Sequence, residues 1–375
     1  METQQQGVTR RLILESGLAA VAAGFLGTGN EVHAQHARPT TGRGDTHPGI
    51  RSIDVHAHYY SQAYFDLFNS DGKRFNADFR STDQGFYYKT PNGSNGPYAA
   101  KWIDLKQRIS DMDQQGLAMQ VLSLTAPMVY WGDADLSHKL STAWNDGASN
   151  AHLAYPDRIL GFCVLPMLYS NHAIDELNRA SKLPGIRGVG LGTNIDHRDL
   201  DDPIFEPVWS RIEQLDFPVF LHAVQTIGGE RLRPFYLGNF LGNPFDTAIA
   251  ASHLIFGGVL DRYPKLRFIL PYAGGAFPIL IGRIDHGWRV RPETKHLPKA
   301  PSSYLDRFYF DTIAHSKPIM EFLISEVGVE RIVLGSDYAA DMGYENPIAF
   351  LEQISLSRAQ REMILGGTAS KLLKL

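Results

Sequence analysis

Two histidines separated by a single residue are the first residues in this sequence whose spacing suggests chemistry. They stand in the short apolar run Ile53-Asp54-Val55-His56-Ala57-His58. In an extended strand, residues i and i+2 point to the same side, so His56 and His58 would project together. Imidazole nitrogens bind divalent metals, and the pair therefore predicts half of a metal site. On its own, the pattern is found more often in a loop or a core.

Two further candidate ligands follow later apolar runs. His222 comes directly after Pro218–Leu221, and Asp337 comes directly after Arg331–Ser336. Taken singly, the histidine is typical of a core or a surface, and the aspartate of a helix N-cap. In a β/α barrel, however, the C-terminal ends of strands one, five and eight meet at one end. We therefore predict a single divalent-metal site made of His56, His58, His222 and Asp337.

The donor types decide which metals this site would accept. Cys163 is the only cysteine and lies in the apolar run Ile159–Leu165, so we interpret it as a buried hydrophobic residue and exclude a disulfide or a cysteine-based zinc site. With imidazole and carboxylate donors, Zn²⁺ is the expected ion, and Mn²⁺ or Fe²⁺ would also bind. Such an ion lowers the pKa of bound water to about 7.

Eight apolar, β-branched runs alternate with stretches of helical period from residue 51 onward. This alternation predicts an α/β fold, a distorted (β/α)8 TIM barrel spanning residues 51–375. An open doubly wound sheet is the alternative, but it needs a glycine-rich turn after its first strand, where this chain has His-Ala-His-Tyr-Tyr. The predicted strands are Ile53–Val55, Met119–Leu124, Ile159–Leu165, Ile186–Leu191, Val219–Leu221, Leu266–Leu270, Phe308–Phe310 and Ile332–Leu334.

Two regions interrupt this alternation. Tyr59–Ala100 is long and rich in aromatic, Asn, Asp and Gly residues, and we expect a small cap or insert after strand one. In Arg283–Ser303, three prolines are expected to prevent a helix.

The first fifty residues have the composition of an export signal. Thr9-Arg10-Arg11-Leu12-Ile13-Leu14 is a twin-arginine pattern, and the uncharged stretch that follows it is too short to span a membrane. A small-x-small site at Val32-His33-Ala34 predicts a signal peptide over residues 1–34, followed by a linker over 35–50. The mature protein would then be periplasmic or extracellular and free of the membrane. The alternative is a tail with a chance arginine pair.

Composition limits the partners of the chain. The 375 residues are 43% hydrophobic and carry a formal net charge of -4, and no run of Lys or Arg that could follow a phosphate backbone is present. A nucleic-acid partner is therefore not expected.

Several motifs along the chain form a recognisable set. They are Asp54-Val55-His56-Ala57-His58, Met112-Asp113-Gln114-Gln115-Gly116, Phe220-Leu221-His222, Gly257-Gly258-Val259 with Tyr263-Pro264-Lys265-Leu266, Gly274-Gly275-Ala276-Phe277-Pro278 with Gly282-Arg283-Ile284, and Gly335-Ser336-Asp337-Tyr338. Together they resemble the amidohydrolase superfamily, and within it the group typified by 2-amino-3-carboxymuconate-6-semialdehyde decarboxylase. The resemblance implies a distorted barrel, one divalent metal, a homodimer, and non-oxidative loss of CO2 from an aromatic or unsaturated carboxylic acid.

The resemblance also implies roles for two further residues. Arg283 matches an arginine that helps to bind a substrate carboxylate across the dimer interface, a role that suits the planar guanidinium, and a surface salt bridge is the alternative. His315 follows strand seven, where it would orient the substrate or cap the next helix.

One position departs from the family pattern. Where the family has a histidine before Gly-Gly, acting as general base, this chain has Tyr272. A phenol has a pKa of about 10 against about 6.5 for imidazole, so Tyr272 is a poor base at neutral pH. Either Asp337 acts as the base while Tyr272 donates a hydrogen bond, or Tyr272 binds the metal as tyrosinate, or turnover has been lost.

These residues support three functions. The leading hypothesis is a metal-dependent non-oxidative decarboxylase of a small aromatic or unsaturated carboxylic acid, in which Asp337 moves the proton and Tyr272 stabilises developing negative charge. A metal-dependent hydrolase of an ester, lactone or amide would use the same groups. A catalytically impaired protein that binds metal and carboxylate is the third possibility.

Overall fold

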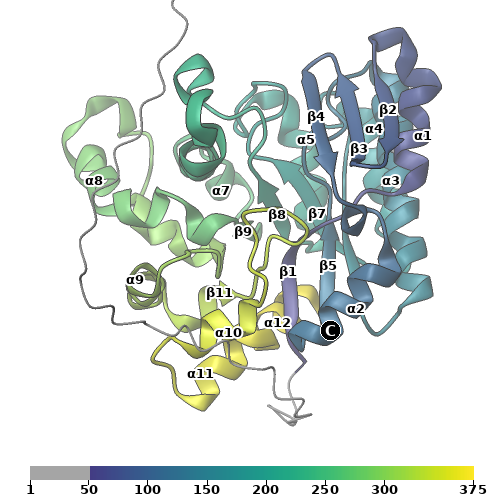
Figure 1. The fold of residues 1–375 in the computed structure, drawn as a ribbon. Helices are drawn as coiled ribbons and strands as arrows, with labels where there is room; N and C mark the ends of the chain where they lie inside the picture. The colour runs from purple at the N-terminus through teal and green to yellow at the C-terminus, as the bar shows by residue number, and fades with distance from the viewer. Residues whose placement is uncertain (1–50) are drawn as a thin grey trace, which may run out of the picture. The chain divides into compact units, whose positions relative to one another are not determined.

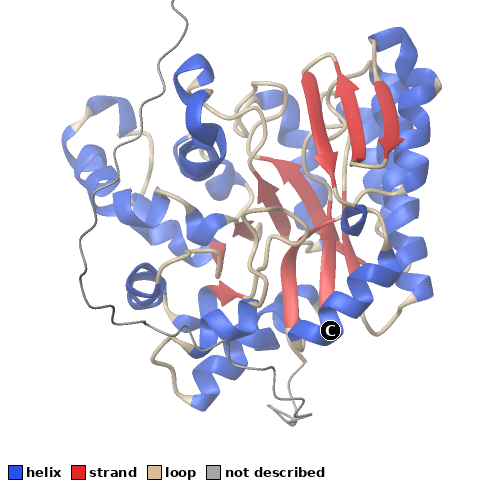
Figure 2. Ribbon diagram, viewed as in Figure 1, coloured by secondary structure: helices blue, strands red, loops and turns tan. Residues whose placement is uncertain are grey.

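The computed structural model describes residues 51–375, and it confirms the predicted barrel. Eight parallel strands form one sheet in the order β1-β5-β6-β7-β8-β9-β10-β11, with helices outside it (Figures 1 and 2). The strands are β1 Ile53–His58, β5 Met119–Ser123, β6 Ile159–Cys163, β7 Ile186–Gly192, β8 Val219–His222, β9 Phe268–Leu270, β10 Phe308–Asp311 and β11 Ile332–Val333. Each of the eight predicted runs overlaps one of these strands.

The last strand closes the barrel against the first. The backbone N–H of Val55 in β1 donates to the carbonyl of Leu334, just after β11, at 2.9 Å. The N–H of Asp337 donates to the carbonyl of His56 at 2.8 Å. Residues nearly the whole chain apart are thereby fixed beside each other, and one predicted metal ligand is tied to the strand that carries two others.

Strand β1 contains an irregularity that aims its histidines. Its pairing with β5 shifts register between Asp54 and Ala57. In a regular strand, His56 would share the face of Asp54, opposite Ile53 and Val55. The shift instead brings the His56 ring to 5.0 Å from the ring of Phe220, which packs in the same buried cluster as Ile53 and Val55. A bulge of this kind re-aims side chains next to a site.

The helices bury their apolar faces on the outside of the strands. Helix α2 shows why they begin and end where they do: the Asp104 side chain accepts from the N–H groups of Lys106 and Gln107, and Gly116 ends the helix with a left-handed φ of 71°. The other helices are α1 Gln62–Asn69, α3 Ala134–Ala154, α4 Ser170–Ala180, α5 Glu206–Leu215, α6 Asn243–Phe256, α7 Val259–Arg262, α8 Phe277–Val290, α9 Lys317–Val327, α10 Pro347–Glu352, α11 Arg358–Glu362 and α12 Thr368–Leu373, and α2 is Leu105–Gln115.

The expected insert after strand one is a small antiparallel sheet with helix α1. Its strands are β2 Asp78–Thr82, β3 Gly85–Thr90 and β4 Gly93–Tyr98, and Figure 2 shows them apart from the barrel strands. Aromatic side chains fill the space beneath this sheet, with Tyr60, Phe65 and Phe86 fully or almost fully buried. Stacked and edge-to-face aromatic pairs of this kind stabilise packing beyond their buried area.

The expectation for Arg283–Ser303 was partly wrong. Helix α8 runs through Arg283 and ends only at Val290. The first proline of the region, Pro292, then opens a 3-10 turn, Pro292–Thr294. A proline disfavours the helical conformation of the residue before it, so it ends the helix at that point and has no effect one turn earlier.

The predicted signal peptide and linker, residues 1–50, lie outside the described residues. From residue 51 onward, no helix is both long and apolar enough to cross a membrane.

Candidate metal centre

The structure brings the four predicted ligand residues together. One ligand atom from each of His56, His58, His222 and Asp337 lies within 4.8 Å of every other, and all four side chains are buried. The closest approaches join Nε2 of His58 to Nε2 of His56, at 3.2 Å, and to Oδ1 of Asp337, at 3.0 Å. The four ligand residues come from the C-terminal ends of β1 and β8 and from the segment after β11. This is the end at which barrel enzymes carry their active sites.

Each of the three imidazoles makes a hydrogen bond through its Nδ1 atom, on the side of the ring away from the centre. The partners are Oδ2 of Asp311 for His56, at 2.7 Å, the Ser123 hydroxyl for His58, at 3.0 Å, and the Thr125 hydroxyl for His222, at 3.1 Å. A ring whose Nδ1 donates outward presents the lone pair of Nε2 to the centre. Metal-binding histidines are oriented in this way, and the arrangement therefore fits a divalent metal.

The charges of the centre also fit a cation. Burial alone would lower the pKa of His56, but the Asp337 and Asp311 carboxylates raise it to about 10. Burial would raise the pKa of Asp337, yet the charge of His56 and the hydrogen bonds from both β1 histidines hold it well below its usual range. Burial keeps the pKa of His222 well below normal. The centre therefore favours positive charge beside Asp337, and metal binding would displace the proton that otherwise lies there.

Asp54 fixes the backbone around the ligands. Its carboxylate accepts from the backbone N–H of His56 at 3.1 Å and from the backbone N–H and hydroxyl of Ser336 at 3.0 and 2.5 Å. Burial raises the pKa of Asp54 to about 6, although these hydrogen bonds oppose the shift. Since Ser336 precedes Asp337, one carboxylate ties the ligand-bearing segment after β11 to β1.

Arg108 supports the same strand from the outside. Its guanidinium is fully buried, donates to Gln120 at 2.9 Å and to the carbonyl of His58, and lies 4.5 Å from the ring of Tyr338. Burial lowers its pKa to about 10. It therefore carries a charge at neutral pH and positions the backbone of a predicted ligand.

Tyr272 lies directly against the centre. Its hydroxyl is 2.9 Å from Nε2 of His222 and accepts a hydrogen bond from Asn243 at 3.3 Å. Burial, together with the nearby charges of Asp337 and Asp311, raises its pKa well above the ordinary value. In this environment the phenol keeps its proton and can donate a hydrogen bond, as the first of the three interpretations of Tyr272 requires.

Three residues at the ends of the last strands adopt left-handed backbone conformations. They are Tyr272 after β9, with φ of 56°, His315 after β10, with φ of 49°, and Asp337 after β11, with φ of 59°. Such residues cost about 1–3 kcal/mol each and persist only where the surroundings enforce them. After Tyr272, a Cβ at Gly275 would meet the carbonyl oxygen of Pro244 at 2.1 Å, so the turn that follows Tyr272 requires glycine at this position.

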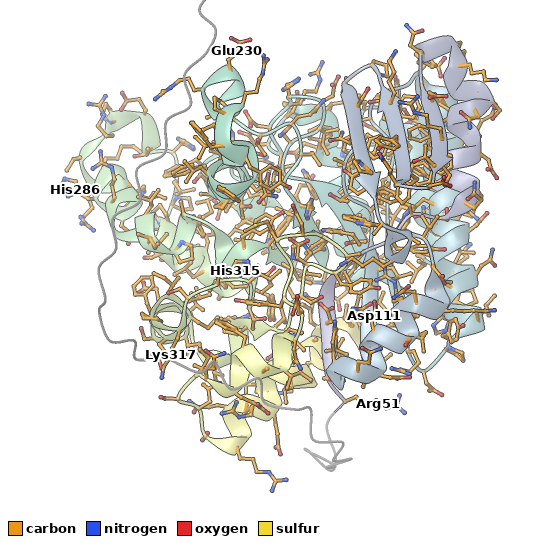
Figure 3. All side chains as sticks on the ribbon, viewed as in Figure 1. Arg51, Asp111, Glu230, His286, His315 and Lys317 are labelled. Atoms are coloured by element: carbon orange, nitrogen blue, oxygen red, sulfur yellow. The ribbon has the colours of Figure 1, made fainter. Side chains whose placement is uncertain are left out.

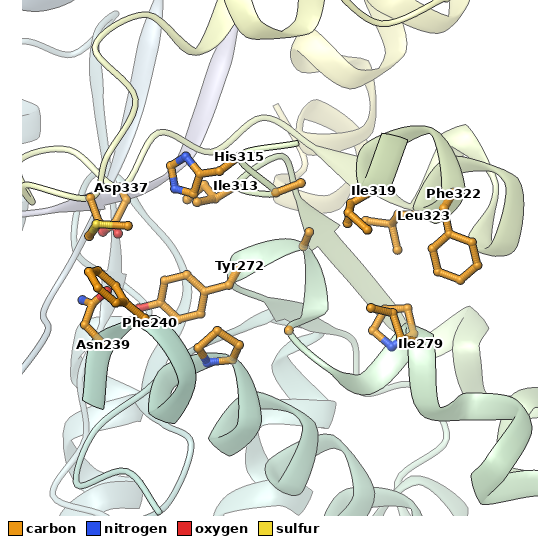
Figure 4. Close-up of a pocket in the computed structure, with 16 residues that line it drawn as sticks. Asn239, Phe240, Tyr272, Ile279, Ile313, His315, Ile319, Phe322, Leu323 and Asp337 are labelled. Carbon is orange, nitrogen blue, oxygen red and sulfur yellow. The ribbon is translucent and has the colours of Figure 1, made fainter. Parts of the chain in front are cut away.

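Two cavities open beside the centre, and both are bounded by Asp337, Tyr272 and Asn239. One, of about 310 Å³, extends under the insert past His58 and His222 and includes Asn95 and Tyr98 of β4. The other, of about 250 Å³, extends between α8 and α9. Figure 4 shows this second cavity, with Asp337 at one end and Phe322 at the other. Each has room for a small molecule next to the predicted metal.

The comparisons with known proteins agree with this geometry. Residues 53–375 match the sequence model of the amidohydrolase family. This chain belongs to the amidohydrolase family. It is 33% identical over 273 residues to 2-amino-3-carboxymuconate-6-semialdehyde decarboxylase of Dictyostelium discoideum, an alignment covering 72% of this chain and 76% of the relative. It is 28% identical to the gamma-resorcylate decarboxylase of Polaromonas sp., over 73% of this chain and 91% of the relative.

A solved structure extends the likeness to the metal. The crystal structure of a dihydroxybenzoic acid decarboxylase of Polaromonas sp., with bound manganese and the inhibitor 2-nitroresorcinol, superposes with a TM-score of 0.71 at 25% identity and covers 87% of this chain and 97% of that one. A divalent metal centre in this amidohydrolase is thus supported by its own donor set and by a relative that holds such an ion.

The two residues expected to bind substrate lie at different distances from the centre. His315 lines the cavity between α8 and α9 together with Tyr272 and Asp337, and its ring packs 4.7 Å from that of Tyr344 (Figures 3 and 4). Arg283 is exposed on α8 and lines neither cavity of this amidohydrolase chain. Figure 3 shows His286 of the same helix pointing outward. Within one chain, the structure does not bring Arg283 to the centre.

Sequence reasoning missed several residues of this amidohydrolase site. Asp311 ends β10 at the same end as the ligands, so the rule that found His222 and Asp337 would have found it. Asn243 begins α6, and Asn239 lies in the preceding turns, far from any predicted strand. No pattern in the sequence marks them.

Proposed function

We propose that this amidohydrolase is a metal-dependent, non-oxidative decarboxylase of a small aromatic or unsaturated carboxylic acid. The observation that carries the proposal is the convergence of three outward-anchored histidines and Asp337 at the base of two cavities, in a chain whose relatives are named decarboxylases. The cavities have aromatic walls, including Tyr98 and Trp102 on one side and Phe240 on the other. Flat, unsaturated molecules pack well against such walls.

His56, His58, His222 and Asp337 would hold the metal. When bound, a divalent ion supplies Lewis-acid stabilisation of substrate oxygens. Zn²⁺ is the expectation from the donor types, and the manganese of the Polaromonas relative makes Mn²⁺ the second ion to test.

Asp337 and Tyr272 would perform the proton chemistry. Asp337 borders both cavities and is ionised at neutral pH, so it would first take up a proton from the substrate's acidic group or from water in the cavity and then pass it to the substrate carbon that bears the carboxylate. The bond from that carbon to the carboxylate then breaks, its electron pair returns to the unsaturated system, and CO2 leaves. Nε2 of His222 cannot both accept from Tyr272 and bind a metal, so the Tyr272 hydroxyl becomes free to donate to a substrate oxygen as negative charge develops.

The function is tested by product analysis. The protein, loaded in turn with Zn²⁺ and Mn²⁺, is incubated with a panel of hydroxybenzoic acids and with a matched panel of lactones and esters. Release of CO2 with the corresponding phenol as the sole other product is expected. Release of a new carboxylic acid from the lactones, without CO2 from the acids, would replace the proposal with a hydrolase.

We also propose that the chain forms a homodimer in which Arg283 reaches the partner's active site. Arg283 lines an apolar groove of about 970 Å³ between α6, α8 and the turns after β8. Several large apolar side chains are exposed around it, among them Leu241 at 41%, Phe245 at 45% and Leu280 at 37%. Contiguous apolar surface of this kind marks an interaction site, and a second copy would bury it.

We further propose that the protein is exported by the twin-arginine route. Its support is the pair Arg10-Arg11 followed by an uncharged, apolar stretch. That route carries folded proteins, which suits an enzyme that acquires its metal before export.

A further inference from the structure

Trp102 lies at the end of the insert, beside the metal centre. It belongs to the 3-10 turn Ala100–Trp102, and its side chain is only 7% exposed. The indole is stacked on the ring of the predicted ligand His58, with 5.9 Å between the ring centroids and 6° between the ring planes. The rings of Tyr60, stacked at 5.6 Å, and of Tyr98, edge-on at 4.9 Å, also pack against it. These contacts fix the orientation of the indole.

The indole N–H of Trp102 differs from those of the other tryptophans. The N–H groups of Trp144, Trp209 and Trp288 each donate to a backbone carbonyl. The indole nitrogen of Trp131 is buried out of reach of solvent. The nitrogen of Trp102 has no hydrogen-bond partner among residues 51–375, yet it remains accessible, and Trp102 lines the cavity under the insert. Since an indole N–H can only donate, a free donor borders this cavity.

The same cavity brings a bound acid to the centre and to Trp102 at once. Its volume is about 310 Å³, and His58, His222 and Asp337 line it together with Trp102. The strongest acceptor that a substrate acid carries is its ionised carboxylate. Hydrogen bonds to an ionised group are roughly twice as strong as those between neutral groups. The carboxylate is therefore the group of the substrate that gains most from the free donor.

We propose that Trp102 binds the carboxylate of the substrate through its indole N–H. This inference rests on the proposed function and names a binding residue for it. A carboxylate accepts about four hydrogen bonds, so the role proposed for Arg283 across the dimer is compatible with it. Because the carboxylate loses its charge as CO2 forms, the hydrogen bond stabilises the bound acid and not the transition state. Trp102 therefore strengthens binding without accelerating the chemical step.

A conservative variant tests this role by binding. Trp102→Phe keeps an aromatic ring against His58 and removes the N–H. In calorimetry with the Zn²⁺-loaded protein, affinity for benzoate should fall about tenfold, as expected for the loss of a hydrogen bond to a charged group. Affinity for nitrobenzene, a neutral molecule of the same shape, and affinity for Zn²⁺ should stay the same. Trp131→Phe, at a tryptophan that lines neither cavity, is the matched control and should bind benzoate normally.

Kinetics should show the same separation. For an acid that releases CO2, Trp102→Phe should raise KM about tenfold without lowering kcat, because the lost hydrogen bond belongs to the bound acid. A fall in kcat with KM unchanged would overturn the inference, since it would place the donor in the transition state.

A spectroscopic measurement on the natural chain needs no altered binding site. With isotopically labelled tryptophan, the 5 tryptophans give separate indole N–H signals in nuclear magnetic resonance, and the signal absent from Trp102→Phe belongs to Trp102. In the Zn²⁺-loaded protein, benzoate should move this proton signal downfield, as a hydrogen bond to a carboxylate does, and nitrobenzene should not. A signal that benzoate leaves in place, or a benzoate affinity that Trp102→Phe leaves unchanged, would overturn the inference.

The outcomes for Trp102 are distinguishable from those for the proposed function. If benzoate moves the signal and its affinity depends on Trp102 while no acid releases CO2, the decarboxylase proposal fails and carboxylate binding by Trp102 stands. If CO2 is released but benzoate neither moves the signal nor depends on Trp102 for its affinity, the role of Trp102 fails and the decarboxylase stands.

Discussion

The Tyr272 hydroxyl lies 2.9 Å from Nε2 of His222, the nitrogen that a metal ion would bind. The contact depends on the left-handed backbone of Tyr272, with φ of 56°, and on the Asn243 amide that donates to the hydroxyl. Where related enzymes are expected to carry an imidazole base, this chain thus holds a phenol whose pKa is raised by burial. The hydroxyl is placed to donate a hydrogen bond, and in the proposed mechanism Asp337 carries the proton.

Replacing Tyr272 tests this division of roles. Tyr272→Phe keeps the ring and removes the donor, and kcat should fall about 10²- to 10³-fold, the usual cost of losing a donor to developing negative charge. Metal content, measured by atomic emission, should stay the same. Tyr272→His should also lose activity. If histidine raised kcat above that of the natural chain, Tyr272 would be a degraded base and the donor role would be wrong.

Asp311 should control metal affinity through His56. Its Oδ2 lies 2.7 Å from Nδ1 of His56, and both groups are fully buried. Asp311→Asn removes the charge that holds the ring, and we expect affinity for Zn²⁺ or Mn²⁺ to fall about 10- to 100-fold in competition with a chelator. Asp306→Asn, an exposed aspartate outside the centre, is the control and should bind metal normally. Equal affinities in the two variants would show that Asp311 has no such role.

Removing the metal should also lower stability. A ligand at a hundredfold excess over its Kd stabilises the folded state by about 2.7 kcal/mol, which corresponds to a rise in Tm of about 5 °C for a domain of a few hundred residues. Differential scanning fluorimetry of the chelated protein, before and after adding Mn²⁺ or Zn²⁺, measures this shift. A His222→Ala variant should show a clearly smaller shift. An unchanged Tm in the natural chain would argue against a metal at this centre.

Much of the fold was predictable because its signals are local. Each barrel strand begins in a short apolar run, and the rule that barrel chemistry gathers at strand ends selected His222 and Asp337 from a long sequence. The β1 histidines were found by the same period-two spacing that defines a strand. The insert was also expected, but its three-stranded sheet was not, since nothing in Tyr59–Ala100 shows regular alternation.

The features that the sequence did not predict depend on contacts between residues far apart in the chain. The bulge in β1 appears in its pairing with β5, and no residue type between Asp54 and Ala57 is a sequence signal for it. Asp54 is important only because Ser336 lies beside it once the barrel closes. A helix was not expected in Arg283–Ser303, yet α8 continues to Val290 because the first proline of the region comes only at Pro292. Sequence patterns identified the four candidate metal ligands that the structure brings together, while closure of the barrel decides which residues hold them in place.

Export is tested with the intact precursor. Arg10→Lys combined with Arg11→Lys keeps the charge of the pair and removes the guanidinium groups that the pathway reads. We expect the variant to stay in the cytoplasm at its full precursor length, whereas the natural chain is shortened near Ala34 and found outside the inner membrane. Immunoblots of the cell fractions report both. Normal export of the variant would refute the twin-arginine interpretation.

Two inactive variants can show whether Arg283 acts across a dimer. Arg283→Ala lacks the arginine and Asp337→Asn lacks the proton carrier, so each alone should be nearly inactive. In a mixed dimer, the chain with intact Asp337 would receive Arg283 from its partner and form one complete site. After random reassortment, about a quarter of the natural activity should return, because about half of the dimers are mixed and each has one such site. No recovery is possible if Arg283 serves its own chain.

A charge in the apolar groove tests where the dimer interface lies. Phe245→Glu places a carboxylate in this groove and should yield monomers in sedimentation velocity, whereas Leu153→Glu, exposed on α3, should not. Dimers that persist in Phe245→Glu would place the interface on another face of the molecule.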